Sequence, residues 1–344
     1  RARRPRREAL SMTSGTTESL RIAVTGGTGF VGAHSVHAFL AAGHSVRLLA
    51  LPGERLDDTL GALGVEVDEA DVVRGDVCDA DTVAELLTGC DAVFHGAGIV
   101  GVDDRRESLM WKVNVGATAT LLAMAVRLGL DPIVHVASYS AIFPSPDAVL
   151  GPDSPTTEGA RSAYGRTKSA ADRIARGFQA AGAPVVVTYP SSIVGPAAGV
   201  RRGVTADGWA PLLRFGVSID FDGSMTMVDV RDVADLHASI MERGHGPRRF
   251  VAGGELLRFD EMLDALEAGA GRPIRRVRVS NRVVRWAGRV SDLAARVLPF
   301  PPGFSSEAAW LLTSAKPTDD SKSLALLGRP WRSVRDALAE IGTP

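Results

Sequence analysis

Residues 21–32, Arg-Ile-Ala-Val-Thr-Gly-Gly-Thr-Gly-Phe-Val-Gly, decide the fold. The apolar run at 21–25 predicts a buried strand, and the periodic stretch at 30–42 predicts a helix. The glycines that connect them have the spacing G-x-x-G-x-x-G. A strand, a glycine turn and a helix N-terminus in this order present backbone N–H groups to a pyrophosphate. The residues predicted to hold it are Gly26, Thr28, Gly29, Phe30, Val31 and Gly32.

Apolar runs and helical stretches alternate from residue 20 to residue 190, which is typical of a parallel sheet with helices on both faces. Strands are expected at 21–25, 46–49, 72–77, 92–95, 132–137 and 184–189, and helices at 30–42, 80–87, 113–128 and 164–181. The sequence therefore predicts an α/β fold, namely a Rossmann-type doubly wound parallel sheet with a smaller C-terminal α/β substrate lobe.

The domain boundaries follow from where this rhythm begins and ends. Residues 1–19 are expected to be a disordered tail or the product of an over-long start, because residues 1–11 carry five arginines and Met12 follows. Organelle targeting by these arginines is the alternative. Residues 20–194 are predicted to bind NAD(P). Residues 195–344 are predicted to form mainly the substrate lobe, with one strand and helix around 226–252 returning to the sheet.

Composition argues against several other classes of protein. A formal net charge of −1 gives no global electrostatic case for a nucleic-acid partner. Cys78 and Cys90 are too few for a disulfide framework and are expected to be inert thiols in a reducing compartment, which predicts a cytoplasmic protein. The histidines, including His34 and His37, show no ligand spacing, so no metal site is expected. No apolar run reaches the roughly 18 residues of a membrane span.

The end of the second strand usually distinguishes NAD from NADP. A carboxylate there binds the ribose 2′-hydroxyl, whereas an arginine accommodates a 2′-phosphate. Leu49, Ala50 and Leu51 offer neither group, and Arg55 lies just beyond them. Arg55 is the candidate residue for binding a 2′-phosphate. The equally weighted alternative is that Arg55 is a solvent-exposed loop residue that binds no ligand. The predicted cofactor is therefore NADP or NAD, with NADP preferred.

Two further strand ends complete the predicted cofactor site. Asp76, followed by Val77, is placed to accept a hydrogen bond from the adenine amino group, or else to cap the helix that begins near residue 79. Gly96 and Ala97 follow the fourth strand, and their small side chains let a ribose lie against the backbone.

Tyr164 and Lys168 lie four residues apart, and therefore on one face of the helix expected at 164–181. A free tyrosine has a pKa of about 10, and a nearby ammonium group favours the phenolate. The pair predicts proton transfer to or from a substrate oxygen, with the lysine also holding the nicotinamide ribose.

The chain resembles the extended short-chain dehydrogenases/reductases, and within them the dihydroflavonol 4-reductase-like, 3β-hydroxysteroid dehydrogenase-like and NAD-dependent epimerase branch. The landmarks occur in the family's order: residues 25–32 (TGGTGFVG), 75–77 (GDV), 114–118 (NVGAT), Tyr164 with Lys168, 189–196 (YPSSIVGP) and 227–234 (MVDVRDVA). Two positions depart from the family pattern. Tyr189 replaces its usual arginine before the proline, and Leu51 replaces its frequent basic residue after the second strand.

The resemblance implies hydride transfer between a nicotinamide cofactor and a secondary alcohol, or the corresponding ketone or aldehyde. It implies that Tyr164 is the acid/base and that Lys168 is its tuning partner. Ser138 would orient the substrate oxygen, with Ser140 as the fallback.

The same resemblance places Pro190 and Ser191 beside the nicotinamide carboxamide. It makes Asn114 structural or water-holding at the back of the site, and it implies a homodimer through paired helices.

Two other functions stay open. A sugar-nucleotide epimerase or dehydratase uses the same triad with tightly held NAD, and a non-catalytic sensor or scaffold usually lacks the tyrosine or the lysine. The expected partner is a small carbonyl or alcohol substrate. Trp209, Met225 and Met227 stand where the family lines its substrate pocket, which favours an apolar substrate, although core packing explains them equally well.

Residues 272–296 hold eight arginines and one aspartate, interleaved with valines and Trp286. This pattern resembles a basic amphipathic helix. The leading interpretation is a helix of the C-terminal lobe with an arginine-rich outer face. Peripheral contact with an anionic membrane is the alternative, and the sequence alone does not favour it.

Overall fold

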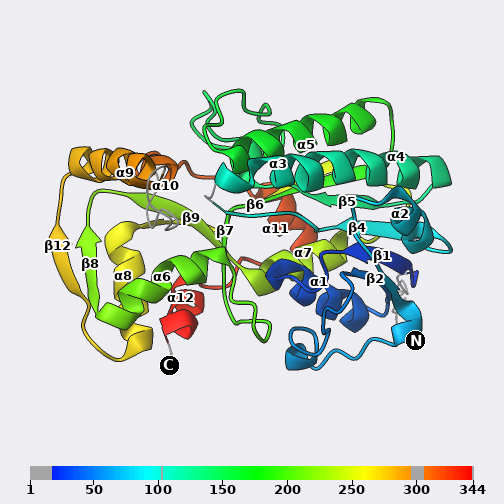
Figure 1. Ribbon diagram of the computed structural model, residues 1–344, viewed down its shortest axis with the longest axis horizontal. Coiled ribbons are helices and arrows are strands. Elements are labelled where there is room, and N and C mark those ends of the chain that lie inside the picture. The colour runs from blue at the N-terminus through cyan, green and yellow to red at the C-terminus, as the bar shows by residue number, and fades with distance from the viewer. Residues whose placement is uncertain (1–17, 102–103, 296–305, 343–344) are drawn as a thin grey trace, which may run out of the picture.

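A computed structural model describes residues 18–101, 104–295 and 306–342 (Figure 1). Most of the predicted N-terminal tail, residues 1–17, lies outside the described residues. The main sheet has seven parallel strands in the order β10-β6-β5-β4-β1-β2-β3. They are β1 (Arg21–Thr25), β2 (Ser45–Ala50), β3 (Val72–Arg74), β4 (Ala92–His95), β5 (Ile133–Val136), β6 (Val185–Pro190) and β10 (Arg248–Ala252). The predicted Rossmann-type parallel sheet is confirmed.

Helices cover both faces of this sheet because its strands are apolar on both sides. Helices α1 (Phe30–Ala41) and α7 (Val230–Ile240) pack together on one face, around Phe39, Phe94 and Leu236. Helices α2 (Ala80–Leu87), α4 (Thr118–Leu128) and α5 (Ala163–Ala180) cover the other face. Figure 1 shows α4 and α5 above the sheet, and α1 and α7 below it.

Helix α4 continues a longer helix. It follows α3 (Glu107–Met110) and the π-helical η4 (Trp111–Ala117) without a break. By length and composition alone, the whole segment Glu107–Leu128 is long and apolar enough to cross a membrane, which differs from the expectation that no such run exists. Its Leu121, Leu122 and Ala125 are fully buried in the sheet core. The core helix of a globular domain passes the same test, so the segment is weak evidence for a membrane span.

The C-terminal lobe lies beside the sheet. It contains the three-stranded sheet β11-β9-β7 and the two-stranded sheet β12-β8. The strands and helices of the lobe are β7 (Ser192–Val194), α6 (Val204–Phe215), β8 (Val217–Asp220), β9 (Ser224–Asp229), β11 (Glu255–Arg258), α8 (Phe259–Ala270), β12 (Arg275–Arg278), α9 (Asn281–Ala295), α10 (Ser306–Leu312), α11 (Ser321–Leu327) and α12 (Val334–Gly342). Strand β10 leaves the lobe and pairs with β6 in the main sheet. The division of the chain at residue 194 stays a prediction.

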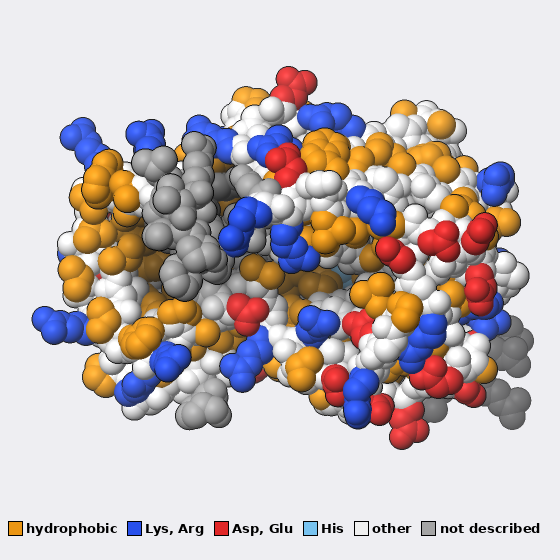
Figure 2. All heavy atoms as spheres, viewed as in Figure 1, with side chains coloured by type: hydrophobic (Ala, Val, Ile, Leu, Met, Phe, Trp, Pro, Cys, Tyr) orange, Lys and Arg blue, Asp and Glu red, His pale blue; other side chains and the backbone are white. Residues whose placement is uncertain are grey.

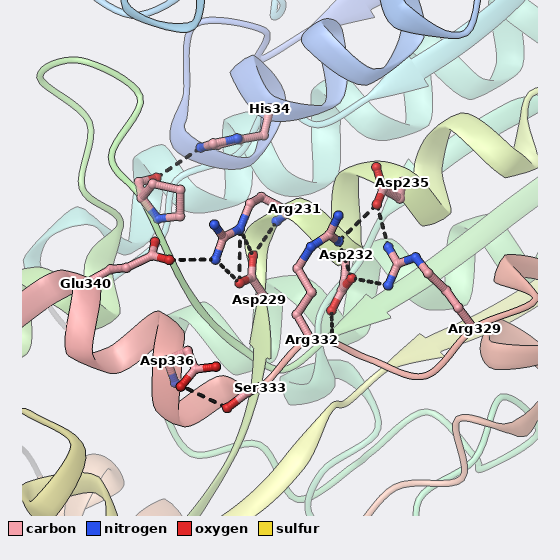
Figure 3. A network of polar contacts seen from close by, with 11 residues as sticks. His34, Asp229, Arg231, Asp232, Asp235, Arg329, Arg332, Ser333, Asp336 and Glu340 are labelled. Carbon is pink, nitrogen blue, oxygen red and sulfur yellow. Dashed lines mark hydrogen bonds and ion pairs between the residues drawn. The ribbon is translucent and has the colours of Figure 1, made fainter.

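Two buried aspartates at the start of α7 tie the end of the chain to this helix (Figure 3). Asp229 caps the Arg231 backbone N–H and pairs with the Arg231 guanidinium, which reaches Glu340 on α12 at 3.1 Å. Asp232, fully buried, pairs with Arg329 at 2.6 Å. Because breaking a buried ion pair leaves an uncompensated charge, this network fixes how the C-terminal segment sits on α7.

Candidate active site

The glycine loop after β1 packs against the end of β4. Gly26 has φ +73°, and a Cβ there would lie 2.6 Å from the backbone nitrogen of Ala97. A Cβ on Gly32 would collide with the carbonyl oxygen of Gly26. Only glycine fits these two positions, so the loop has a single tight path from strand to helix.

The N-terminus of α1 is open to a ligand. Gly29, its N-cap residue, supplies no side-chain cap among the described residues, and Phe30 and Val31 are partly exposed. The orphan N–H groups of this first turn and the positive end of the helix dipole favour an anion. Thr28 is buried at the loop, and the ring of Phe30 lies against residue 203 of the lobe. Loop and helix therefore form a cradle that fits a pyrophosphate.

The end of β2 carries both a cation and an anion. Arg55 is largely exposed, with its nitrogen 3.5 Å from Asp58. Glu54 accepts a hydrogen bond from the Leu51 backbone N–H at 3.2 Å, and Arg201 lies 3.6 Å from its other oxygen. Arg55 is free to turn toward a ligand here, and Glu54 is already held in place.

Asp76 is exposed at the turn after β3. Its carboxylate accepts a hydrogen bond from the Cys78 backbone N–H at 2.9 Å, whereas Asp79 caps α2 by accepting from Thr82. Asp76 is therefore not the cap of that helix. Val77 beside it is half-buried against the sheet core.

The structure brings Ser138, Tyr164 and Lys168 together. Ser138 follows β5, while Tyr164 and Lys168 stand one turn apart on α5. The Ser138 side chain interacts with the Tyr164 hydroxyl and acts to lower its pKa. Lys168 Nζ donates to the carbonyl oxygen of Val136 at 2.9 Å. Ser140, the fallback, instead donates its backbone N–H to Ser138 Oγ at 3.2 Å.

Burial dominates the electrostatics of this trio. It lowers the pKa of Lys168 from 10.5 to about 8. It also raises the pKa of Tyr164, and the interaction with the Ser138 side chain partly offsets that rise. Tuning of Tyr164 by the ammonium group of Lys168 stays a prediction, because the lysine points at Val136.

Asn114 closes the back of the site from the π-helical η4. Its side chain accepts from the Ile99 backbone N–H at 2.7 Å and donates to the Ile99 carbonyl oxygen at 3.0 Å and to Thr167 Oγ1 at 3.1 Å. A Cβ on Gly98 would come within 3.3 Å of Asn114 and 3.7 Å of Lys168 Nζ. The side chain thus holds residues 98–99 and α5 in place.

The other predicted residues lie at the neighbouring strand ends. Gly96 and Ala97 touch the glycine loop, and Pro190 is buried at the end of β6. Ser191 donates its hydroxyl to the Gly253 carbonyl oxygen at 2.7 Å. Tyr189, which replaces the family's arginine, points into the core under α5 and donates to Asp172 at 2.6 Å.

The residues expected to line an apolar pocket belong to the lobe core instead. Trp209 and Met227 are buried there, Met225 packs against the same cluster, and the Trp209 ring contacts Phe259 at 5.6 Å. Core packing, the alternative that the sequence left open, is what the structure shows for them.

No local sequence pattern indicates the aromatic wall that lies beside Ser138. Tyr139, Phe143 and Trp310 contact in series with ring centroids 5.3 and 4.9 Å apart, and Arg161 lies over the Trp310 ring at 4.5 Å. Trp310 comes from α10, far along the chain, so no local pattern could reveal the contact.

The sequence also missed a buried connection through His95. Its ring nitrogens lie 2.7 Å from Thr25 Oγ1 and 2.9 Å from Thr118 Oγ1, and Thr118 in turn donates to the Asn114 carbonyl oxygen. Burial and the charge of Lys168 lower the pKa of His95 to about 3, so the ring is neutral. This chain links the end of β1, next to the glycine loop, to the helix that carries Asn114.

Within the described residues, no group of His, Cys, Asp and Glu side chains is arranged to hold a metal ion. His34 instead hydrogen-bonds the Pro196 carbonyl oxygen at 3.0 Å (Figure 3). Cys78 and Cys90 are both free, and burial raises the pKa of each thiol.

Comparison with known proteins gives one consistent result. Residues 22–253 match the model of the NAD dependent epimerase/dehydratase family. The chain is 29% identical to sterol demethylase protein B of Methylococcus capsulatus, covering 92% of this chain and 95% of that protein. It is 28% identical to a putative dihydroflavonol 4-reductase of Synechocystis, covering 92% of each. The crystal structure of DesIV, a dTDP-glucose 4,6-dehydratase from Streptomyces venezuelae with NAD and TYD bound, superposes with a TM-score of 0.69 at 25% identity, covering 94% of this chain and 95% of that one.

Proposed function

Because the chain belongs to the NAD-dependent epimerase/dehydratase family, an extended short-chain dehydrogenase/reductase family, we propose that it is an oxidoreductase of CH–OH groups with Ser138, Tyr164 and Lys168 as catalytic residues. It interconverts an alcohol with the corresponding carbonyl compound, a secondary alcohol with a ketone or a primary alcohol with an aldehyde. The observation that carries this proposal is that Ser138, at the end of β5, lies by Tyr164, while Lys168, one turn further along α5, bonds the Val136 carbonyl oxygen of the same strand. A serine, a tyrosine and a lysine in this arrangement serve proton transfer at a carbonyl oxygen.

The cofactor residues fit a dinucleotide. Gly26 and Gly32 allow the tight turn that leads from β1 into α1, and the first turn of α1 offers N–H groups to the pyrophosphate. Asp76 and Val77 would contact the adenine, Gly96 and Ala97 a ribose, and Pro190 with Ser191 the carboxamide. A bound nicotinamide would supply or accept the hydride.

Side chains of the protein transfer the proton and hydrogen-bond the substrate oxygen. In the reducing direction, the Tyr164 hydroxyl donates its proton to the substrate oxygen, and the Ser138 hydroxyl donates a hydrogen bond to the same atom. Buried Lys168, as an ammonium group, favours the phenolate that Tyr164 becomes and holds the nicotinamide ribose. In the oxidising direction, the same groups act in reverse order.

We propose NADP as the preferred cofactor. No carboxylate stands at residues 49–51, and exposed Arg55 is free to turn from Asp58 toward a 2′-phosphate. The carboxylate of Glu54 lies at the same turn and favours NAD instead, because it would repel a 2′-phosphate. The ratio of kcat/KM for NADPH to that for NADH measures the preference, and Arg55→Gln should lower this ratio without changing activity with NADH.

The substrate class follows from the wall beside Ser138. Tyr139, which follows Ser138, and Trp310 are partly exposed on either side of Phe143, which is buried in the sheet core. The exposed part of these rings supports an apolar or aromatic substrate. The names of the two relatives, a sterol-demethylating protein and a dihydroflavonol reductase, point in the same direction.

A substrate panel tests the proposal. Purified protein is incubated with NADPH or NADH and with steroid ketones, dihydroflavonols and simple aldehydes, and cofactor oxidation is followed. We expect turnover that Tyr164→Phe lowers by at least about a hundredfold while cofactor binding persists. Tyr189→Phe is the matched control, because the Tyr189 hydroxyl donates to Asp172 in the core and lies outside the proposed proton path.

The two competing functions give different outcomes in the same assay. A sugar-nucleotide substrate converted at unchanged redox level, with NAD copurifying, would replace the proposal by an epimerase or dehydratase. Cofactor binding without turnover of any carbonyl, and with Tyr164→Phe indistinguishable from wild type, would indicate a sensor or scaffold.

We also propose that this enzyme is cytoplasmic and forms a homodimer through paired helices. The two free thiols support a reducing compartment. Light scattering of the purified chain tests the dimer, and fractionation of the native host tests the compartment.

A further inference from the structure

Helix α9 (Asn281–Ala295) has three distinct faces. Val284 and Gly288 are buried against the lobe. Val283, Trp286, Ala287 and Val290 form a second face at spacing i, i+3, i+4 and i+7, and all four are exposed. Trp286 is 65% exposed, Val283 50% and Val290 44%. We name these four residues the α9 stripe. A lobe helix buries its apolar stripe, so an exposed one is a feature that folding does not explain.

Arginines form the third face of α9. Arg282, Arg285 and Arg289 follow the spacing i, i+3 and i+7, which places them on one side of the α9 stripe. Arg285 donates to Thr313 Oγ1 at 3.0 Å. Arg282 and Arg289 have no ion pair with any described residue. The helix thus presents a cationic face next to an apolar one.

The exposed apolar surface continues on the neighbouring sheet of the same lobe. Val217 and Ile219 on β8 and Val277 on β12 are each 40–49% exposed, and Val277 pairs with Ile219. Phe215, at the end of α6, is 70% exposed. Figure 1 places α9, β8 and β12 at one end of the molecule, and Figure 2 shows hydrophobic and Lys/Arg side chains gathered there. The Asp and Glu side chains of that view lie mostly at the opposite end.

We propose that the α9 stripe, together with the exposed face of β8 and β12, docks on the surface of an anionic phospholipid bilayer. Valines and a tryptophan enter the headgroup boundary, while the flanking arginines meet lipid phosphates. A nucleic acid would use the arginines but leave the apolar stripe exposed. A second copy of the chain on the same patch would add a second set of arginines to the interface and no counter-charge, whereas lipid phosphates supply that counter-charge.

The docked face adjoins the proposed active site but does not depend on it. Helix α9 packs against α10, whose Trp310 belongs to the aromatic wall beside Ser138. Docking requires only the surface residues, so it is tested without any assumption about the substrate.

Vesicle co-sedimentation of the full chain tests the proposal. We expect binding to vesicles of phosphatidylcholine with about 30% phosphatidylglycerol, weak binding to phosphatidylcholine alone, and release at high salt. The double variant Arg282→Gln/Arg289→Gln should weaken binding about 25-fold, at about fivefold per arginine near an anionic surface. Trp286→Ser with Val290→Ser should abolish binding although every arginine is kept.

Arg127→Gln with Leu128→Ser is the matched control. It removes an exposed arginine and an exposed leucine at the end of α4, outside the α9 stripe, and should leave binding unchanged. Equal binding to neutral and anionic vesicles, no binding to either, or equal losses in the control and the α9 variants would overturn the proposal. The proposal would also be overturned if the chain binds no vesicles and forms a dimer that Trp286→Ser dissociates. Reduction of a water-soluble carbonyl, measured in parallel, reports separately on the proposed function.

Discussion

Lys168 donates a hydrogen bond from Nζ to the backbone carbonyl oxygen of Val136, 2.9 Å away. The bond joins α5 to the end of β5, two residues before Ser138, while the side chain is almost fully buried. One lysine therefore sets the distance between the two elements that carry the other proposed catalytic residues. Its position imposes an energetic cost, because a buried ammonium group is poorly solvated.

This cost predicts that Lys168→Met stabilises the protein while it abolishes turnover. Burial lowers the pKa of Lys168 from 10.5 to about 8, so the unfolded chain binds the proton more tightly than the folded one. The free energy of unfolding therefore rises as pH increases from about 8 to 10.5. Below this window the buried charge costs up to about 3 kcal/mol. Methionine removes that cost and loses one hydrogen bond, for a net gain of roughly 1–2 kcal/mol at neutral pH.

Urea denaturation at neutral pH and near pH 10 measures the effect. The advantage of Lys168→Met should shrink at the higher pH, where wild type also holds a neutral side chain. Lys322→Met, at an exposed ion pair, should change the free energy of unfolding by less than about 0.5 kcal/mol. A Lys168→Met variant less stable than wild type at neutral pH would contradict the prediction.

Gly32→Ala is predicted to weaken cofactor binding by at least about tenfold. The new Cβ collides with the Gly26 carbonyl oxygen, so the loop must move away from the first turn of α1. Fluorescence titration with NADPH measures the dissociation constant. Gly177→Ala on α5 is the control, because its added Cβ meets nothing within 4 Å beyond the backbone of its own helix and its chain neighbours. It should leave binding unchanged and raise the free energy of unfolding by about 0.5–1 kcal/mol. Equal affinities for the two variants would show that the loop path does not matter.

The parts of the site that are local in sequence could be predicted from it. The glycine loop, and Tyr164 with Lys168, each lie within one strand-turn-helix unit or one helix, so spacing alone places their groups together. The alternating pattern likewise predicted the strands up to residue 190. Beyond residue 190 the sequence pattern is weaker: α6 contains Pro211 in its interior, and β9 ends at Asp229 where α7 follows directly.

Contacts between distant segments could not be predicted. The aromatic wall joins Phe143 and Trp310, which lie far apart in the sequence. His95 likewise hydrogen-bonds residues of separate elements. The apolar side chains of Trp209 and Met227 fit a substrate pocket and a core equally well, and only the tertiary packing shows that they lie in the lobe core. The three faces of α9 became visible only when the structure showed which one the lobe buries.

Tyr189→Phe is predicted to destabilise the fold without lowering kcat. The Tyr189 hydroxyl donates to buried Asp172 at 2.6 Å and accepts from Arg176 at 2.9 Å. Removing it leaves a fully buried carboxylate with one fewer donor, which costs about 1–3 kcal/mol. Thermal and urea unfolding measure the loss, and steady-state turnover provides the comparison. A fall in kcat at unchanged stability would instead mean that Tyr189 acts in the site.

His135→Leu is predicted to stabilise the protein, whereas His95→Leu destabilises it. The two rings stack on adjacent strands with centroids 5.6 Å apart, and both are buried. Neither ring nitrogen of His135 has a hydrogen-bond partner within the described part of the chain, but both nitrogens of His95 are paired. Leucine at 135 removes an unsatisfied polar ring, for a gain of about 1–2 kcal/mol. Leucine at 95 removes one hydrogen bond from each of the buried Thr25 and Thr118 hydroxyls, at a cost of about 1–3 kcal/mol.

The pH dependence of stability provides a second readout for the same pair. Burial, with neighbouring charge, holds the pKa of His135 well below 6.5, so the unfolded chain takes up a proton first as pH falls. Wild type therefore loses stability below about pH 6.5, by about 1.4 kcal/mol per pH unit for each such histidine. Either leucine variant should show a shallower acid loss, although their stabilities at neutral pH move in opposite directions. Urea denaturation from neutral pH to about pH 5 measures both effects, and a destabilised His135→Leu would mean that the ring has a partner, such as a buried water.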